Sequence, residues 1–162
     1  MTINAEQLLR SPRTAQVLRP AAGHEVVYGT TGSGKTTRVK KLLAEDQKAG
    51  REIWIIDSTG TDQPDWDGKA HRYARNVTEA RDLLTELLDI ARHDAWSRRP
   101  TTITIEGAQH MLRDYECRRL VERTLSDARG YNVRFRMVVQ TLHLTSFGES
   151  VVIRSAVLGG AA

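Results

Sequence analysis

A run of eight residues constrains the fold of this 162-residue chain more than any other part of its sequence. The run is Gly29-Thr30-Thr31-Gly32-Ser33-Gly34-Lys35-Thr36, and it matches the pattern G-x-x-x-x-G-K-[ST] at every fixed position. In this pattern, glycines let successive backbone N–H groups turn inward around a phosphate chain. The lysine, here Lys35, reaches the β- and γ-phosphates, and the hydroxyl of Thr36 ligates Mg²⁺. The chain is therefore predicted to bind a nucleoside triphosphate, with ATP and Mg²⁺ as the expected ligands. The predicted contacts are Gly29, Thr30, Thr31, Gly32, Ser33, Gly34, Lys35, Thr36 and Thr37.

The residues on either side of this loop supply the structural context that the pattern needs. A strand is expected over His24–Tyr28, because Pro20 and Gly23 break the chain before an apolar run. After the loop, apolar residues recur at helical spacing, and Gly50 predicts where that helix ends. A helix that begins beside Lys35 adds the positive end of its dipole to the phosphate site.

Strands and helices alternate along the rest of the chain. Strands are predicted over Ile53–Ile56, His71–Ala74, Thr101–Ile105 and Val133–Val139, and helices over Val77–Ala91 and Met111–Ala128. Residues 58–69 are expected to form a surface loop, and residues 1–23 an N-terminal arm or short helix before a domain of residues 24–162. This alternation predicts an α/β fold with an open, mostly parallel sheet that is covered by helices on both faces.

The composition is that of one folded domain. With 40% hydrophobic and 27% charged residues, the chain is long enough to bury a core but too short for a second full domain. No apolar run approaches the ~20 residues of a membrane span, and residues 1–6 lack a signal-peptide core, so a cytoplasmic protein is expected. The single cysteine, Cys117, is interpreted as a structural thiol. The net charge of +4 is compatible with a nucleic-acid partner but does not identify one.

Three polar residues directly follow predicted strands, where ligands of open α/β sheets bind. They are Asp57, Glu106 and Gln140. Hydrolysis of a triphosphate needs an acid that holds the Mg²⁺ sphere, and often a second group that orients or deprotonates the attacking water. Glu106 is the candidate for the first task, Asp57 is a second candidate metal ligand, and Gln140 is placed to hydrogen-bond the γ-phosphate or its water. The competing interpretation for each residue is a polar strand end that only completes a turn.

The order of these motifs resembles the motor core of the FtsK/SpoIIIE and HerA group of DNA-pumping ATPases. The similarity covers about residues 24–158 and rests on the loop, the run Ile53–Asp57, the Glu106 strand, and the block Asp127–Gly130 leading into Arg136–Thr141. That block is similar to the family's Gly-Arg-type turn before a strand ending in Thr-Gln. The resemblance implies a three-layer RecA-like P-loop NTPase fold and a ring-shaped homo-oligomer, usually a hexamer. It also implies ATP hydrolysis between subunits that drives movement along double-stranded DNA, in transfer or packaging.

The chain departs from this family at a position that matters for catalysis. The run Glu106-Gly107-Ala108-Gln109-His110 stands where many motor ATPases carry Asp-Glu-Ala-Gln or Asp-Glu-Ala-His. In one register Glu106 takes the Asp position and Gly107 replaces the catalytic glutamate. In the other register Glu106 is the base, and no acid remains for the Mg²⁺ sphere. One carboxylate is missing either way, so Glu106 serves both roles, Asp57 assists, or hydrolysis is slow.

Three functions stay open on the sequence alone. The first is a Mg-ATP-dependent motor that acts on DNA, with Lys35, Glu106 and Gln140 as its catalytic residues. The second is a nucleotide-binding regulator or assembly subunit with little turnover, which Gly107 supports. The third is a small P-loop phosphotransferase, although the sequence shows no acceptor-site signature. The candidates for an arginine that reaches a neighbouring subunit's phosphate are Arg123, Arg129 and Arg154.

Overall fold

The computed structural model describes residues 6, 11–20, 23–60, 66, 68–94, 99–127 and 132–159. Its strands are β1 (Gln16–Leu18), β2 (Glu25–Tyr28), β3 (Glu52–Asp57), β4 (Arg72–Ala74), β5 (Thr101–Glu106) and β6 (Val133–Val139). Its helices are α2 (Lys35–Lys48), α4 (Val77–Asp94), α5 (Ala108–Met111), α6 (Tyr115–Asp127) and α7 (Val151–Leu158), with a 3-10 turn, η2 (Leu144–Phe147), before α7. Parts of the predicted arm (residues 1–23) and loop (residues 58–69) lie outside the described residues.

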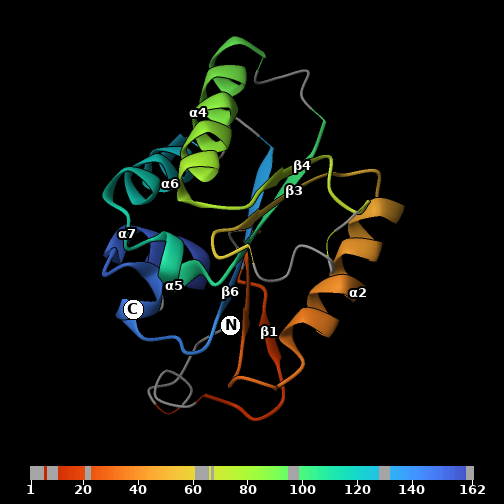
Figure 1. Ribbon diagram of the computed structural model, residues 1–162, viewed down its shortest axis with the longest axis vertical. Helices are drawn as coiled ribbons and strands as arrows, with labels where there is room; N and C mark the ends of the chain where they lie inside the picture. Colours follow the sequence, from red (N-terminus) through yellow and green to blue (C-terminus); the bar gives the residue numbers. More distant parts are fainter. Residues whose placement is uncertain are drawn as a thin grey trace.

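The strands form one six-stranded sheet in the order β1-β2-β6-β5-β3-β4 (Figure 1). Every neighbouring pair is parallel except β1 and β2, which are antiparallel. In register, Tyr28 lies opposite Val139, and Asp57 lies opposite Glu106. The carboxyl ends of β2, β6, β5 and β3 therefore meet at one edge of the sheet. Asp57 and Glu106 are the last residues of their strands, and Gly29 and Gln140 directly follow theirs.

Helices cover both faces of the sheet (Figure 1), which confirms the predicted three-layer RecA-like α/β fold. Helix α2 lies on one side, and α4, α6 and α7 lie on the other. On β3, Ile53 and Ile55 pack in the cluster that includes α2, whereas Trp54 and Ile56 pack in the larger cluster on the opposite face. Successive side chains of a strand point to opposite faces, so a strand with helices on both sides is apolar at every position. This is why the run in β3 does not alternate with polar residues.

The predicted helix over Met111–Ala128 is wrong at its start, because the structure breaks the chain between α5, which ends at Met111, and α6, which begins at Tyr115. Asp114 causes the break: its carboxylate accepts a hydrogen bond from the Cys117 backbone N–H at 2.9 Å, which caps the start of α6. Arg81 of α4 pairs with the same carboxylate, and the pKa of Asp114 falls to about 2, chiefly through this hydrogen bond. Tyr115, the first residue of α6, is 60% exposed.

Two further elements were not predicted from the sequence. Strand β1 lies within the predicted arm, and it extends the sheet by pairing with β2. Helix α7 follows the last predicted strand, and it begins at Ser150, whose hydroxyl accepts a hydrogen bond from the Ile153 N–H at 3.1 Å. Among the described residues, none of the helices combines the length and the apolar character that a membrane crossing requires.

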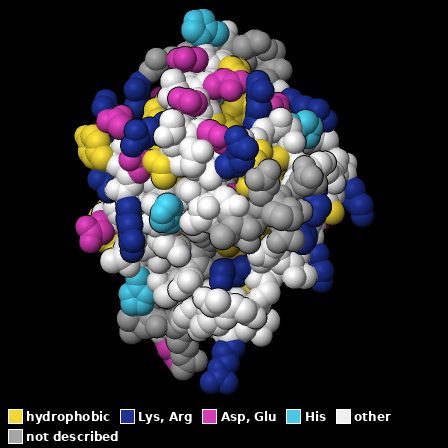
Figure 2. Space-filling model, in the orientation of Figure 1, with side chains coloured by type: hydrophobic (Ala, Val, Ile, Leu, Met, Phe, Trp, Pro, Cys, Tyr) yellow, Lys and Arg dark blue, Asp and Glu magenta, His cyan; other side chains and the backbone are white. Residues whose placement is uncertain are grey.

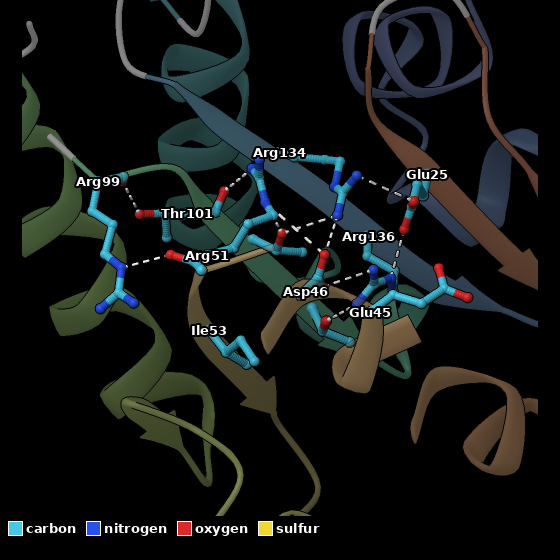
Figure 3. Close-up of polar contacts among 12 residues, drawn as sticks. Glu25, Glu45, Asp46, Arg51, Ile53, Arg99, Thr101, Arg134 and Arg136 are labelled. Atoms are coloured by element: carbon cyan, nitrogen blue, oxygen red, sulfur yellow. Dashed lines mark hydrogen bonds and ion pairs between the residues drawn. The ribbon is translucent and has the colours of Figure 1, made fainter. Parts of the chain in front are cut away.

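A buried ion network joins α2 to β2 and β6 at the amino ends of the strands (Figure 3). Arg136 of β6 contacts Glu25 of β2 at 2.7 Å and Asp46 of α2 at 2.9 Å. Arg134 also pairs with both acids, and Arg51 lies 4.0 Å from Asp46. Burial raises the pKa of Glu25, but the charges of Arg136 and Arg134 outweigh it and lower this pKa below its usual value. The network therefore ties together the strand before the phosphate loop, the helix after it, and the strand that ends at Gln140.

Candidate nucleotide-binding site

The phosphate loop joins β2 to α2 in the conformation that its glycines permit. Gly32 and Gly34 have φ values of 77° and 87°, in the left-handed region that residues with a Cβ rarely adopt. The segment before β1 braces the loop, because the Thr30 N–H donates to the Pro12 carbonyl and the Ala15 N–H donates to the Ser33 carbonyl, both at 2.9 Å. The loop is thus held by part of the predicted arm as well as by its own turn.

Lys35 begins α2 and folds back over the loop. Its Nζ donates to the carbonyl oxygens of Gly29 and Thr30, both at 2.8 Å. Burial lowers the pKa of Lys35, and the negative charge of Glu106 acts in the opposite direction. The ammonium group is therefore positioned over the loop, within the electrostatic reach of Glu106.

A cavity of about 430 Å³ lies at the carboxyl edge of the sheet, beside this loop. Its lining residues are Thr31, Gly32, Gly34, Lys35, Thr36, Asp57, Thr59, Glu106, Gly107, Gln109, Val138, Val139 and Gln140. The structure thus brings Lys35, Thr36, Asp57, Glu106 and Gln140 around one cavity. The sheet order explains this convergence, because β6 lies between β2 and β5 and places Gln140 between the loop and Glu106. The Gln140 side-chain nitrogen donates to the Thr31 hydroxyl at 3.4 Å.

The oxygen donors on this cavity fit a magnesium ion. The Thr36 hydroxyl and the carboxylates of Glu106 and Asp57 all border it. Mg²⁺ prefers such hard oxygen ligands, and in phosphate sites it takes only one or two carboxylates and fills its octahedron with water and phosphate. Asp57 also accepts hydrogen bonds from the Thr59 hydroxyl at 3.0 Å and the Tyr73 hydroxyl at 3.2 Å, so its carboxylate is held in place. Thr36, Glu106 and Asp57 therefore offer the kind of oxygen donors that a magnesium ion takes.

The sequence of the chain matches the family model described as AAA domain over residues 19–146. This stretch covers most of the chain and contains the loop, α2 and the strands β2 to β6. The chain belongs to this AAA domain family. No curated protein sequence is similar enough to it to count as a relative.

The fold of this AAA domain is similar to that of a solved structure, the pCW3 conjugation coupling protein TcpA in a monomer form with ATPγS. The TM-score is 0.62 at 12% sequence identity, and the similarity covers 97% of the AAA domain chain and 56% of TcpA. At this identity the comparison shows a shared fold. The chain spans little more than half the length of TcpA.

Gly107 marks the turn from β5 into α5 of the AAA domain. Its φ of 56° and ψ of 47° are left-handed, and a Cβ at this position would meet no atom within 4 Å. The position after Glu106, where one register of the resemblance predicts a glutamate, is thus occupied by a tight turn. Two residues later the chain places Gln109 on the same cavity. The sequence alone did not suggest a role for Gln109. Its position three residues after Glu106, in the run Glu-Gly-Ala-Gln-His, could have indicated that it lies near the same cavity.

Two of the three candidate trans-acting arginines lie in the part of the AAA domain that the structure describes. The Nε of Arg154 donates to the Leu142 carbonyl oxygen at 3.0 Å, so this side chain is engaged within its own chain. Arg123 is exposed on α6. Arg129 lies outside the described residues, as does most of the block over residues 127–130.

Proposed function

We propose that this AAA domain binds Mg-ATP at the carboxyl edge of its sheet and hydrolyses it. The observation that carries the proposal is the convergence of Lys35, Thr36, Glu106, Asp57 and Gln140 on one cavity beside the phosphate loop. Lys35 neutralises charge on the phosphates, and Thr36 and Glu106 hold the metal with Asp57 in support. Gln140 contacts the γ-phosphate. When bound, Mg²⁺ would offset the negative charge of the triphosphate.

A second cavity supports the placement of the nucleoside. It has a volume of about 480 Å³, and its lining includes Gly34, Thr37 and Arg38 on the far side of the loop. Gly34 borders both cavities. A triphosphate held by the loop at the first cavity would extend past Gly34 into the second, which is large enough for a base and a ribose. This placement gives Thr37 its predicted contact.

We further propose that hydrolysis drives movement along double-stranded DNA within a homo-oligomeric ring, as in the FtsK/SpoIIIE and HerA group. The support is the order of motifs and the fold shared with a conjugation coupling protein. On the face seen in Figure 2, acidic and basic side chains of the described residues are interspersed, so this face does not indicate a DNA track. Arg123 is the described candidate for contact with a neighbour's phosphate, and Arg129 stays a second candidate. A cytoplasmic location is part of the same proposal.

The alternative function is an ATP-binding regulatory or assembly subunit with little turnover. Gly107 favours it, because the glutamate that deprotonates water in the resembling motors is missing. A P-loop phosphotransferase is the third candidate, and no feature of the described residues singles it out.

Phosphate release with and without double-stranded DNA separates these functions. We expect the purified protein to hydrolyse ATP in the presence of Mg²⁺ and DNA to increase the rate. ATP binding without turnover at any DNA concentration would establish the regulator. Transfer of the γ-phosphate to a small acceptor would establish the phosphotransferase. Molar mass measured in solution with and without nucleotide tests the proposed ring. A ring-shaped motor should have the mass of an oligomer rather than that of a single chain.

A further inference from the structure

Gln109 carries a buried polar atom that has no hydrogen-bond partner among the described residues. The atom is its side-chain oxygen Oε1, and the same side chain lines the cavity that we propose holds the triphosphate. A buried polar atom without a partner is energetically unfavourable, because it has lost its hydrogen bonds to water. Rotation of the amide toward the cavity would remove this cost if a water molecule stood there. An uncompensated acceptor beside a reaction site is therefore a candidate ligand for the reacting water.

The backbone around Gln109 fixes where its side chain begins. The left-handed turn at Gly107 ends β5 after Glu106 and starts α5, and the His110 N–H donates to the Gly107 carbonyl at 2.8 Å. Ala108 and Met111 are fully buried, so α5 has one orientation on the core. The His110 ring nitrogen Nδ1 lies 2.9 Å from the Ser58 hydroxyl, which ties α5 to the segment after Asp57.

We propose that Gln109 is the residue that orients the attacking water, a role that rests on the proposed hydrolysis of ATP. Gln140 is the other glutamine on the cavity, but its amide nitrogen already donates to Thr31 of the phosphate loop. Gln140 is therefore engaged with the phosphate loop, whereas Gln109 lies three residues after Glu106, beyond the end of β5. Glu106 and Gln109 together supply two hydrogen-bond acceptors for one water molecule. When both hydrogens of the water are donated to these acceptors, the direction of its oxygen lone pairs is fixed.

The step balances without a further reactant. The water donates one hydrogen bond to the Glu106 carboxylate and the other to Gln109 Oε1. Its oxygen forms a bond to the γ-phosphorus while the bond from that phosphorus to the bridging oxygen breaks, and ADP leaves with the electron pair. One water proton is released to solvent, and the other stays on the released phosphate. Gln109 exchanges no proton and acts by position, a role that a glutamine side chain also has in some other P-loop NTPases.

Replacement of Gln109 by methionine tests this role, because methionine has a similar length but offers no comparable acceptor. We expect Gln109→Met to lower the single-turnover rate of phosphate release by about 10²-fold, while the dissociation constant for ATP stays within about twofold. Gln109→Glu retains an acceptor oxygen at the same position. This variant should hydrolyse faster than Gln109→Met. Gln47→Met, on the exposed last turn of α2, is the matched control and should match wild type.

The outcomes separate this inference from the function on which it rests. Wild-type turnover in Gln109→Met would overturn the role of Gln109 and leave the proposed ATPase intact. Loss of ATP binding in Gln109→Met, with the circular dichroism spectrum unchanged, would also overturn it, because the residue would then bind nucleotide. Absence of turnover in the wild-type protein would refute the proposed hydrolysis itself and the inference with it.

Discussion

Arg136 is the centre of the buried ion network, and its replacement by methionine should destabilise the fold strongly. Its side chain is 1% exposed and contacts Glu25, Asp46 and the Thr104 hydroxyl at 2.7, 2.9 and 3.3 Å. Methionine fills much of the same volume but leaves two buried carboxylates without their principal partner. Removal of one member of a buried ion pair costs about 3–5 kcal/mol, because the remaining charge is uncompensated. In a chain of this size that loss corresponds to a melting temperature about 6–20 °C lower.

Urea denaturation followed by circular dichroism measures this loss. Arg119→Met is the matched control, since Arg119 is exposed on α6, and it should change the free energy of unfolding by less than about 0.5 kcal/mol. The double variant Arg136→Met/Glu25→Gln removes one of the stranded charges and should recover part of the loss. A loss below about 1 kcal/mol in Arg136→Met would refute the reasoning. It would mean that Arg134 and Arg51 compensate both acids unaided.

Two further predictions concern packing and pH. Gly148→Ala should destabilise the protein more than Gly50→Ala, because both positions have positive φ but only at Gly148 would a new Cβ overlap the Leu112 carbonyl; equal melting temperatures would contradict this. His24 accepts the Phe135 N–H at 3.1 Å through Nδ1, and burial, with a contribution from Arg134, lowers its pKa below 6.5. Because the unfolded chain binds the proton more readily, the stability from His24 is present above pH 6.5 and is lost as pH falls below it. Unfolding measured from pH 7.5 to 5 should show this loss in wild type and not in His24→Gln, and identical slopes would contradict it.

The phosphate loop and the strand ends could be predicted because their signals are local. The glycine pattern determines the loop backbone, and an apolar run such as Ile53–Ile56 identifies a doubly covered strand wherever it lies in the sheet. Parallel strands then bring Asp57, Glu106 and Gln140 to one edge without further information. The position of β6 between β2 and β5 is a consequence of tertiary packing, and it decides that Gln140 lies next to the loop.

The features that escaped prediction depend on contacts between distant residues. Strand β1 is stabilised by its pairing with β2, and its three residues are too few to show the alternating pattern that predicts a strand. Arg134 and Arg136 are charged residues within a buried strand, and only the distant acids Glu25 and Asp46 make their burial tolerable. The break at Asp114 had a local signal, an acidic residue able to cap a helix, but the apolar spacing across it was continuous.

Phosphate release by the wild-type protein and by Lys35→Ala tests the central claim most directly. Lys48→Ala, on the exposed last turn of the same helix, is the control for a lost positive charge. If the cavity beside the loop is the catalytic site, wild type and Lys48→Ala release phosphate from Mg-ATP at similar rates, and Lys35→Ala releases none above background. Equal rates in wild type and Lys35→Ala would contradict the claim, because the hydrolysis would then take place without the lysine that the site provides.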